Sequence, residues 1–296
     1  MRSTLIADGF KCTSHRFGMW RIAFGLYMAY YYLRLLPYSV EMFSSDRNLP
    51  GADLVALNSY FPDALLNYDS SWVVQLILIF SVVFSLMIAL GWKRRIGALC
   101  LWPLLMWMYN RNPSGDSPEY EYINWLVFIL IFIPGGEAHG LDEEDPQWKF
   151  PPIYYWGGWL LLSLGYAIAG IAKYRSHNQN WFDGTAMYYI LATDNARRGW
   201  YGNFFDHFPK EVFYPITWGS LYLEMFAPLC VLFRRTRLWW WCISTVVHFV
   251  ILIFINIPQV SYGMILFHLF VFDENWLNGT RFMKKETLES TSASHS

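Results

Sequence analysis

The sequence predicts an all-α protein, a polytopic integral membrane bundle of about eight transmembrane helices. Of its 296 residues, 55% are hydrophobic and 20% aromatic, whereas only 15% are charged. Soluble domains carry roughly 25% charged residues and lack long apolar stretches. Here the apolar residues gather in stretches close to the roughly 20 residues that a spanning helix needs. The expected class is therefore a membrane protein.

The predicted spans follow one another along the chain. They are Phe17–Val40, Ser71–Gly91, Ile96–Tyr109, Tyr122–Pro134, Ile153–Lys173, Val212–Phe233, Leu238–Ile257 and Ser261–Asn275. The third, fourth and eighth are short for a full crossing. We expect residues 1–280 to form one transmembrane domain and residues 281–296 to form a disordered cytoplasmic tail.

Basic residues between the spans predict the orientation, because cytoplasmic loops are enriched in lysine and arginine. Such cytoplasmic loops are predicted at the runs Lys93-Arg94-Arg95 and Arg234-Arg235, and Arg237 follows the second run. Alternating spans place these runs, both termini and the tail on one side. The sequence therefore predicts that both termini are cytoplasmic and that segments 41–70 and 174–211 face outward.

Net charge and residue spacing argue against other classes. The formal net charge is −1 and no basic face is apparent, whereas nucleic-acid binding needs clustered lysine and arginine. The cysteines lack a paired spacing, and the histidines have no cysteine or carboxylate at ligand spacing, so no metal site is expected.

Several ionisable residues lie within predicted spans, where each needs a partner or a function. Arg21 is close enough to the inner surface to snorkel, and Arg34 can snorkel at the outer surface or pair with an acid. Glu224 lies near mid-depth, four residues before Pro228, and is either a structural partner of an Arg or His or a catalytic group. His248 lies at similar depth on the next span. It is either a bundle residue with its hydrogen bonds satisfied or a base, and it could contact Glu224.

The stretch from Gly165 to Tyr189 carries the most chemistry. Lys173 ends the fifth span at its outer surface, where it is either a snorkelling anchor or a reactive amine. A lysine held among apolar and aromatic groups loses hydration and can act as a neutral base. We expect Trp181 and Asp183 to lie beside it, and Glu119, Glu121 and Asn124 to approach the same rim from the fourth span.

These residues resemble a known family. The run IAGIAKY at 168–174, followed by Trp181, Gly184 and Met187, is similar to the segment of vitamin K-dependent gamma-carboxylases that contains their active-site lysine. It is also similar to the bacterial horizontally transferred transmembrane (HTTM) family. Weaker matches follow in the same order, at Arg21, Gly25, Ser45-Asp46-Arg47, Leu49-Pro50, Glu224, Pro228 and His248.

The resemblance implies a chemistry. Lys173 would deprotonate reduced vitamin K or a related naphthoquinol, which reacts with O₂, and CO₂ could then be fixed on an acceptor. Glu224 and His248 would join Lys173 as catalytic residues. Substrate-binding residues would be Arg34, Trp181, Asp183, Glu119, Glu121 and Asn124. Where the family's carboxylases have a histidine, this chain reads Pro118 to Asn124 without one. It also ends about where the membrane part ends, without the large extramembrane domain of the animal enzymes.

Two other functions remain open. The first is a non-carboxylating membrane factor for maturation of, or immunity to, a secreted peptide. The second is a transporter whose path is lined by the ionisable residues, although the sequence has neither the repeated halves nor the interrupted helices typical of transporters. The expected partners are the lipid bilayer, a lipid-soluble quinol and a secreted peptide or protein substrate.

Overall fold

The computed structural model describes residues 10–44, 69–112, 119–176, 179–193 and 199–277, and all regular secondary structure in these ranges is helical. The chain divides into two compact units, one formed by Thr13–Pro151 and the other by Met1–Cys12 with Pro152–Ser296. The predicted all-α class is confirmed. The segment Ser45–Pro50 and the predicted tail at 281–296 lie outside the described residues.

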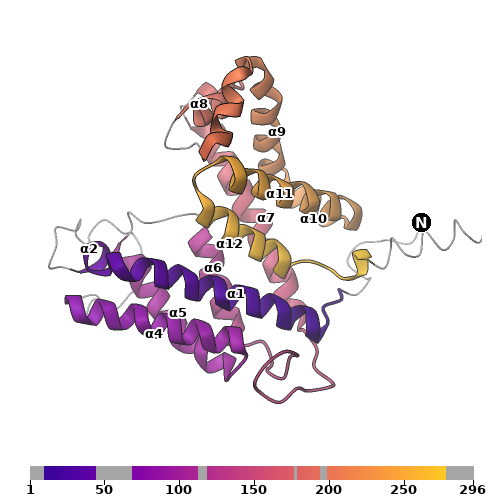
Figure 1. Ribbon diagram of the computed structural model, residues 1–296. Helices are drawn as coiled ribbons and strands as arrows, with labels where there is room; N and C mark the ends of the chain where they lie inside the picture. Colours follow the sequence, from indigo (N-terminus) through magenta and orange to yellow (C-terminus); the bar gives the residue numbers. More distant parts are fainter. Residues whose placement is uncertain (1–9, 45–68, 113–118, 177–178, 194–198, 278–296) are drawn as a thin grey trace, which may run out of the picture. The chain divides into compact units, whose positions relative to one another are not determined.

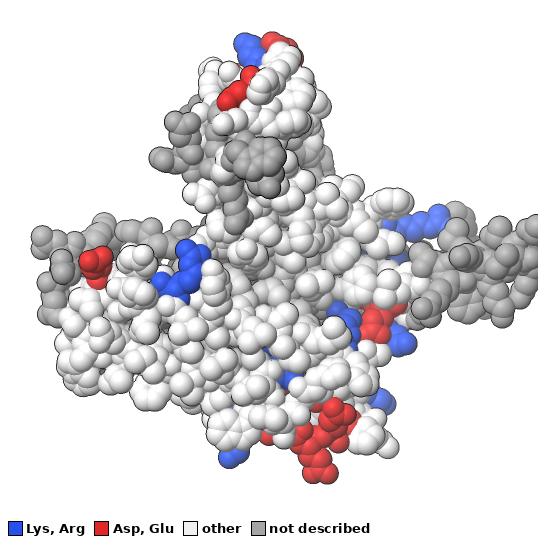
Figure 2. Space-filling view, in the orientation of Figure 1, with Lys and Arg blue, Asp and Glu red and all other residues white. Residues whose placement is uncertain are grey.

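Within the described residues, three helices are long and apolar enough to cross a membrane, α4 (Ser71–Leu90), α7 (Pro152–Arg175) and α11 (Arg234–Phe254). Helix α4 exposes large apolar side chains along its length, including Trp72 (65% exposed), Phe80 (50%) and Leu90 (51%). In Figure 2 the visible faces are largely uncharged, and basic and acidic side chains gather in a few places. Such exposed apolar surface suits contact with lipid rather than water.

The Thr13–Pro151 unit is built on α1 (Ser14–Leu35), which lies along α4 (Figure 1). A Cβ atom at Gly25 would lie 2.4 Å from the backbone nitrogen of Ala89, so only glycine permits this close approach. The unit continues through a short 3₁₀ turn and three further helices. Their bounds are η1 (Leu36–Tyr38), α2 (Ser39–Phe43), α5 (Arg94–Arg111) and α6 (Glu119–Leu130).

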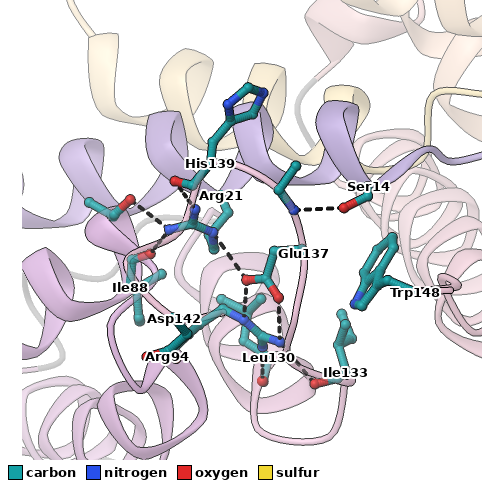
Figure 3. Close-up of polar contacts among 12 residues, drawn as sticks. Ser14, Arg21, Ile88, Arg94, Leu130, Ile133, Glu137, His139, Asp142 and Trp148 are labelled. Atoms are coloured by element: carbon teal, nitrogen blue, oxygen red, sulfur yellow. Dashed lines mark hydrogen bonds and ion pairs between the residues drawn. The ribbon is translucent and has the colours of Figure 1, made fainter. Parts of the chain in front are cut away.

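A buried ion cluster closes one end of this unit (Figure 3). Glu137, which follows α6 in a loop, pairs with two arginines. Its Oε1 lies 3.1 Å from Arg21 Nε and 2.7 Å from Arg94 Nε. The side chains of Arg21, Arg94 and Glu137 are 0%, 2% and 4% exposed, so the three charges are removed from solvent.

Backbone carbonyls accept hydrogen bonds from both arginines of the cluster. Arg21 donates to the carbonyls of Ile88 and Ala89 in the last turn of α4, and to that of His139. Arg94 likewise donates to the carbonyls of Leu130, at the end of α6, and of Ile133 and Pro134 just beyond it. The carbonyls at a helix end lack intrahelical partners and carry partial negative charge, so these arginines cap two helices.

Two sequence expectations are corrected here. Arg21 does not snorkel, because its side chain is fully buried and engaged with Glu137 and three carbonyls. Arg94 is not part of a solvated loop, because it opens α5 and lies 2% exposed. Both guanidinium groups bind the Glu137 carboxylate and the carbonyls at helix ends in place of water.

The second unit is centred on α7, whose buried face packs against the helices that follow it. The core includes Tyr155, Trp159, Trp240 and Phe267, and Phe10 stacks on Tyr155 with ring centroids 3.7 Å apart. The other elements of this unit follow in chain order. They are η5 (Gln179–Trp181), α8 (Ala186–Ala192), η6 (Gly199–His207), η7 (Lys210–Phe213), α9 (Tyr214–Met225), α10 (Ala227–Leu232), α11 and α12 (Pro258–Phe270).

The predicted span Val212–Phe233 is not one continuous helix. It divides into η7, α9 and α10, and the break between the last two lies at Phe226. Pro228 follows in the first turn of α10, where its missing N–H is tolerated, whereas inside a continuous helix it would remove a hydrogen bond.

The second basic run also differs from its predicted place. Arg234 begins α11, and Arg237 is buried, with its guanidinium 4.7 Å from the ring centroid of Trp156. A cation over an indole face is stabilised by the ring quadrupole. Arg237 is therefore a packing residue of this unit instead of a loop charge.

Replacing Glu137 by Gln should strongly destabilise the protein. The substitution leaves two buried guanidinium groups without a carboxylate, and removal of one partner from a buried ion pair costs about 3–5 kcal/mol. The melting temperature of the detergent-purified protein is expected to fall sharply. The control is Glu143→Gln, at an exposed position of the same loop. Equal melting temperatures for the two variants would contradict the structural role of Glu137.

Candidate functional site

The second unit brings Lys173 and Glu224 together. Lys173 lies in the last turn of α7 and Glu224 in the last turn of α9. Lys173 Nζ lies 2.5 Å from Oε1 and 2.6 Å from Oε2 of Glu224. Their side chains are 31% and 16% exposed, so the pair is partly buried and still reachable. Both residues were predicted site residues, and Lys173 is the partner that Glu224 takes.

An aromatic ring covers the same ammonium group. Trp181, at the end of η5, places its ring centroid 5.0 Å from Lys173 Nζ. The indole nitrogen of Trp218 on α9 donates to the carbonyl of Phe182 at 3.0 Å, which ties the segment after α7 to α9. Lys173 is thus held between a carboxylate and an aromatic face.

Gly170 allows this pair to form. A Cβ atom at this position would lie 2.8 Å from the backbone nitrogen of Met225 and 3.0 Å from Glu224 Cβ. Because Gly170 is three residues before Lys173, it lies on the same face of α7, one turn away. The absence of a side chain at Gly170 therefore brings α9, and with it Glu224, within reach of Lys173.

Asp183 forms hydrogen bonds within its own turn. Among the described residues, no interaction joins it to Lys173. Its Oδ1 accepts from the backbone nitrogen of Thr185 at 2.9 Å and from the hydroxyl of Thr185 at 2.5 Å. These hydrogen bonds hold the pKa of the exposed Asp183 carboxyl below its usual range. Gly184 has φ +84 and packs against Tyr214, so the turn also sets the start of α9.

His248 belongs to a second polar cluster of the same unit. Its Nε2 lies 2.5 Å from the hydroxyl of Tyr166 on α7, and its ring centroid lies 5.5 Å from that of His268 on α12. His268 Nδ1 lies 2.7 Å from the carbonyl of Met264, so this nitrogen carries a proton. Ser244 Oγ lies 3.0 Å from His268 Nε2 and donates to the carbonyl of Trp240 at 2.7 Å.

The two clusters share α7 and have separate partners. Tyr166 is seven residues before Lys173, which places both on one face of the helix about 10 Å apart. The expected contact between Glu224 and His248 is not among the contacts of the described residues, since Glu224 binds Lys173 and His248 binds Tyr166.

The remaining predicted site residues belong to the Thr13–Pro151 unit. Arg34 is exposed and lies 5.8 Å from the ring centroid of Tyr30. Glu121 and Asn124 line a cavity of about 120 Å³ together with Tyr109 and Tyr120. The buried Oδ1 of Asn124 has no hydrogen-bond partner in the described residues. Glu119 begins α6, and its side chain lies outside the described part of the chain.

The geometry at Lys173 suits proton transfer. An amine and a carboxylate at 2.5–2.6 Å can exchange a proton, and the neutral amine so produced is a base. A ring at 5.0 Å offers a stacking surface for a flat aromatic ligand. Tyr166, Ser244 and His268 were not predicted as site residues. The spacing of seven residues between Tyr166 and Lys173 could have placed Tyr166 on the same face of α7 as Lys173. No local pattern in the sequence indicates Ser244 or His268.

The helical architecture and the apolar spans define a membrane protein. The model of the HTTM domain matches residues 11–276, and the chain belongs to this family. The HTTM domain is found in membrane proteins related to vitamin K-dependent carboxylases. The chain has no match among the curated proteins or the solved structures, so the roles of individual residues rest on their geometry.

Replacing Gly170 by Ala should separate α7 from α9 at the site. The added methyl group collides with backbone at 2.8 Å, and overpacking of this kind costs about 1–3 kcal/mol. Gly219→Ala is the matched control, because a Cβ atom there has nothing within 4 Å. We expect a lower melting temperature for Gly170→Ala only. A melting temperature as high as that of Gly219→Ala would show that the close approach is not required.

Proposed function

We propose that this protein is a membrane enzyme that oxidises a reduced naphthoquinol with O₂, with Lys173 as the base. The bidentate contact of Lys173 with Glu224 under the ring of Trp181 carries the proposal. Membership of the HTTM family supports it, because that domain occurs in carboxylase-related proteins. Carboxylation of a secreted peptide or protein is the proposed use of this chemistry.

The residues around Lys173 fit a quinol. The ring of Trp181 gives a flat aromatic surface, and Lys173 Nζ lies where a phenolic hydroxyl stacked on that surface would donate its proton. Quinols are lipid-soluble, and α7 carries exposed apolar side chains at Ile168 and Ile171, along which such a molecule can approach. A bound quinol supplies the reducing electrons, and its oxidation by O₂ leaves one oxygen atom in an epoxide and the other in water.

Glu224 gives the amine its basic form. As long as the shared proton remains on Lys173, the ammonium cannot accept another. Transfer of that proton to Glu224 leaves an uncharged amine beside an uncharged acid, a state that a partly buried site accommodates without separated charges. Lys173 can then take the hydroxyl proton of the quinol, while Trp181 keeps the ring in place.

The protein is further proposed to cross the bacterial inner membrane about eight times, with both termini in the cytoplasm. Three helices meet the length and composition of a span. Helices α1, α5, α6 and α12, with α9 and α10 together as one span, would complete the eight. In this topology the lysine end of α7 faces outward, toward a secreted acceptor.

Lys173 can be tested with two substitutions. Lys173→Ala removes the amine, whereas Lys173→Arg keeps a cation for Glu224 that stays protonated at any working pH. Both variants should fold and lose epoxide formation by at least about 100-fold, the scale of general base catalysis. The assay adds reduced vitamin K to purified protein without oxygen, admits O₂ and measures epoxide by chromatography. Lys149→Ala, at an exposed lysine of the other unit, is the control. Epoxide formation by Lys173→Arg at the wild-type rate would exclude an amine base.

Glu224→Gln tests the proton acceptor. The amide can still contact Lys173 but cannot take its proton, so we expect turnover to fall by about 100-fold with a smaller change in melting temperature. Glu211→Gln, at an exposed carboxylate before α9, serves as its control. If turnover persisted while the melting temperature fell, Glu224 would be a structural partner alone.

A non-carboxylating factor for maturation of, or immunity to, a secreted peptide is the second candidate. The pair of Lys173 and Glu224 also favours this function. A lysine that contacts a carboxylate and an aromatic ring can serve to stabilise the fold without taking part in a reaction. The absence of epoxide from the wild-type protein, with peptide resistance retained by Lys173→Ala in cells, would select this function.

A further inference from the structure

A cavity of the Thr13–Pro151 unit lies beside the ion cluster. It has a volume of about 470 Å³. Its lining includes the basic run Lys93, Arg94 and Arg95 at the start of α5, and Glu137 and Asp142 from the loop after α6. We propose that this cavity binds the phosphate of an anionic membrane phospholipid, whose acyl chain lies along α5.

The charges of the cavity favour a phosphate. Both carboxylates are already engaged, since Glu137 accepts from Arg94 and Asp142 Oδ2 accepts from the backbone nitrogen of Lys93 at 2.8 Å. Lys93 and Arg95 are exposed, and neither forms an ion pair with a carboxylate of the described residues. The lining therefore carries three cations against two carboxylates, and this excess of positive charge favours an anion.

Arg95 is held in a suitable position. Its Nε donates to the carbonyl of Ile131 at 2.8 Å, which fixes the stem and leaves the two terminal nitrogens directed away from that bond. The terminal nitrogens of a guanidinium bind two phosphate oxygens at once. Lys93 has φ +45, in the left-handed region, and it lines the cavity together with Arg95.

The apolar side of the cavity identifies a lipid as the source of the phosphate. Ile96 and Leu99 line it and are 51% and 54% exposed, on the surface of α5 that leads away from the basic run. Trp92, next to Lys93, is 48% exposed, and tryptophan is enriched at membrane interfaces. A basic group above an apolar strip matches a headgroup with its attached chain, and basic pockets beside membrane helices bind anionic headgroups.

Gly135 provides a way to close the cavity. It lines the cavity, its φ is outside the left-handed region, and a Cβ atom there has nothing within 4 Å. Gly135→Phe should therefore fill the space without straining the backbone or touching the ion pairs of Glu137. It complements Lys93→Gln/Arg95→Gln, which removes the charges and keeps the space.

The experiment is native mass spectrometry of the full chain in detergent, titrated with phosphatidylglycerol or with phosphatidylcholine. We expect the wild type to bind one phosphatidylglycerol in preference to phosphatidylcholine, and both cavity variants to bind it at least about tenfold more weakly. The matched control is Arg234→Gln/Arg235→Gln, which removes two exposed arginines from the other unit and should bind like the wild type.

Three results would overturn the assignment. These are equal binding of the two lipids by the wild type, an equal loss in the control and cavity variants, and unchanged binding in Gly135→Phe. A further measurement adds glycerol phosphate to the lipid-bound protein, at the same concentration as the lipid. Displacement of the lipid would assign the site to a soluble phosphate ester, whereas retention of the lipid supports the contribution of Ile96 and Leu99.

Discussion

The pairing of Glu137 with Arg21 and Arg94 holds one end of the Thr13–Pro151 unit together, and it answers a constraint that governs the whole chain. A charge removed from water must find its partners within the protein. Arg21 joins α1 to the end of α4, Arg94 joins the start of α5 to the end of α6, and Glu137 links the two arginines. All four helices of this end therefore depend on one carboxylate.

The second unit meets the same constraint with a pair of a different kind. Glu137 pairs with the guanidinium groups of two arginines, side chains that do not act as bases at neutral pH. Glu224 faces a lysine, which can give up its proton, and the side chains are 31% and 16% exposed where those of the cluster are nearly inaccessible. The first arrangement is suited to stability and the second to proton transfer. This difference, more than the presence of an ion pair, distinguishes the proposed reactive site from the structural cluster.

Small residues and helix breaks decide where these pairs can form. Gly25 brings α1 against α4 near Arg21, and Gly170 brings α9 against α7 near Lys173. Pro228 ends α9 soon after Glu224, so the carboxylate lies at a helix end and not within a continuous span. The turn at Asp183 then fixes the segment that carries Trp181. The site is thus a product of close helix approach and of a short, ordered connection between α7 and α9.

The sequence by itself determined the all-α membrane class and the approximate position of most helices, because apolar length is a local feature. It singled out Lys173 as a candidate, because a lysine at the end of a span is also a local feature. It also marked Glu224 and Trp181. Only the tertiary structure decided which partners these residues take. In the structure Glu224 pairs with Lys173 and not with His248, and His248 contacts Tyr166. The tertiary structure buried Arg21 and Arg94 around a glutamate that no local pattern singled out. The reason is that these contacts depend on which helix faces meet, and they join residues 43 to 116 positions apart.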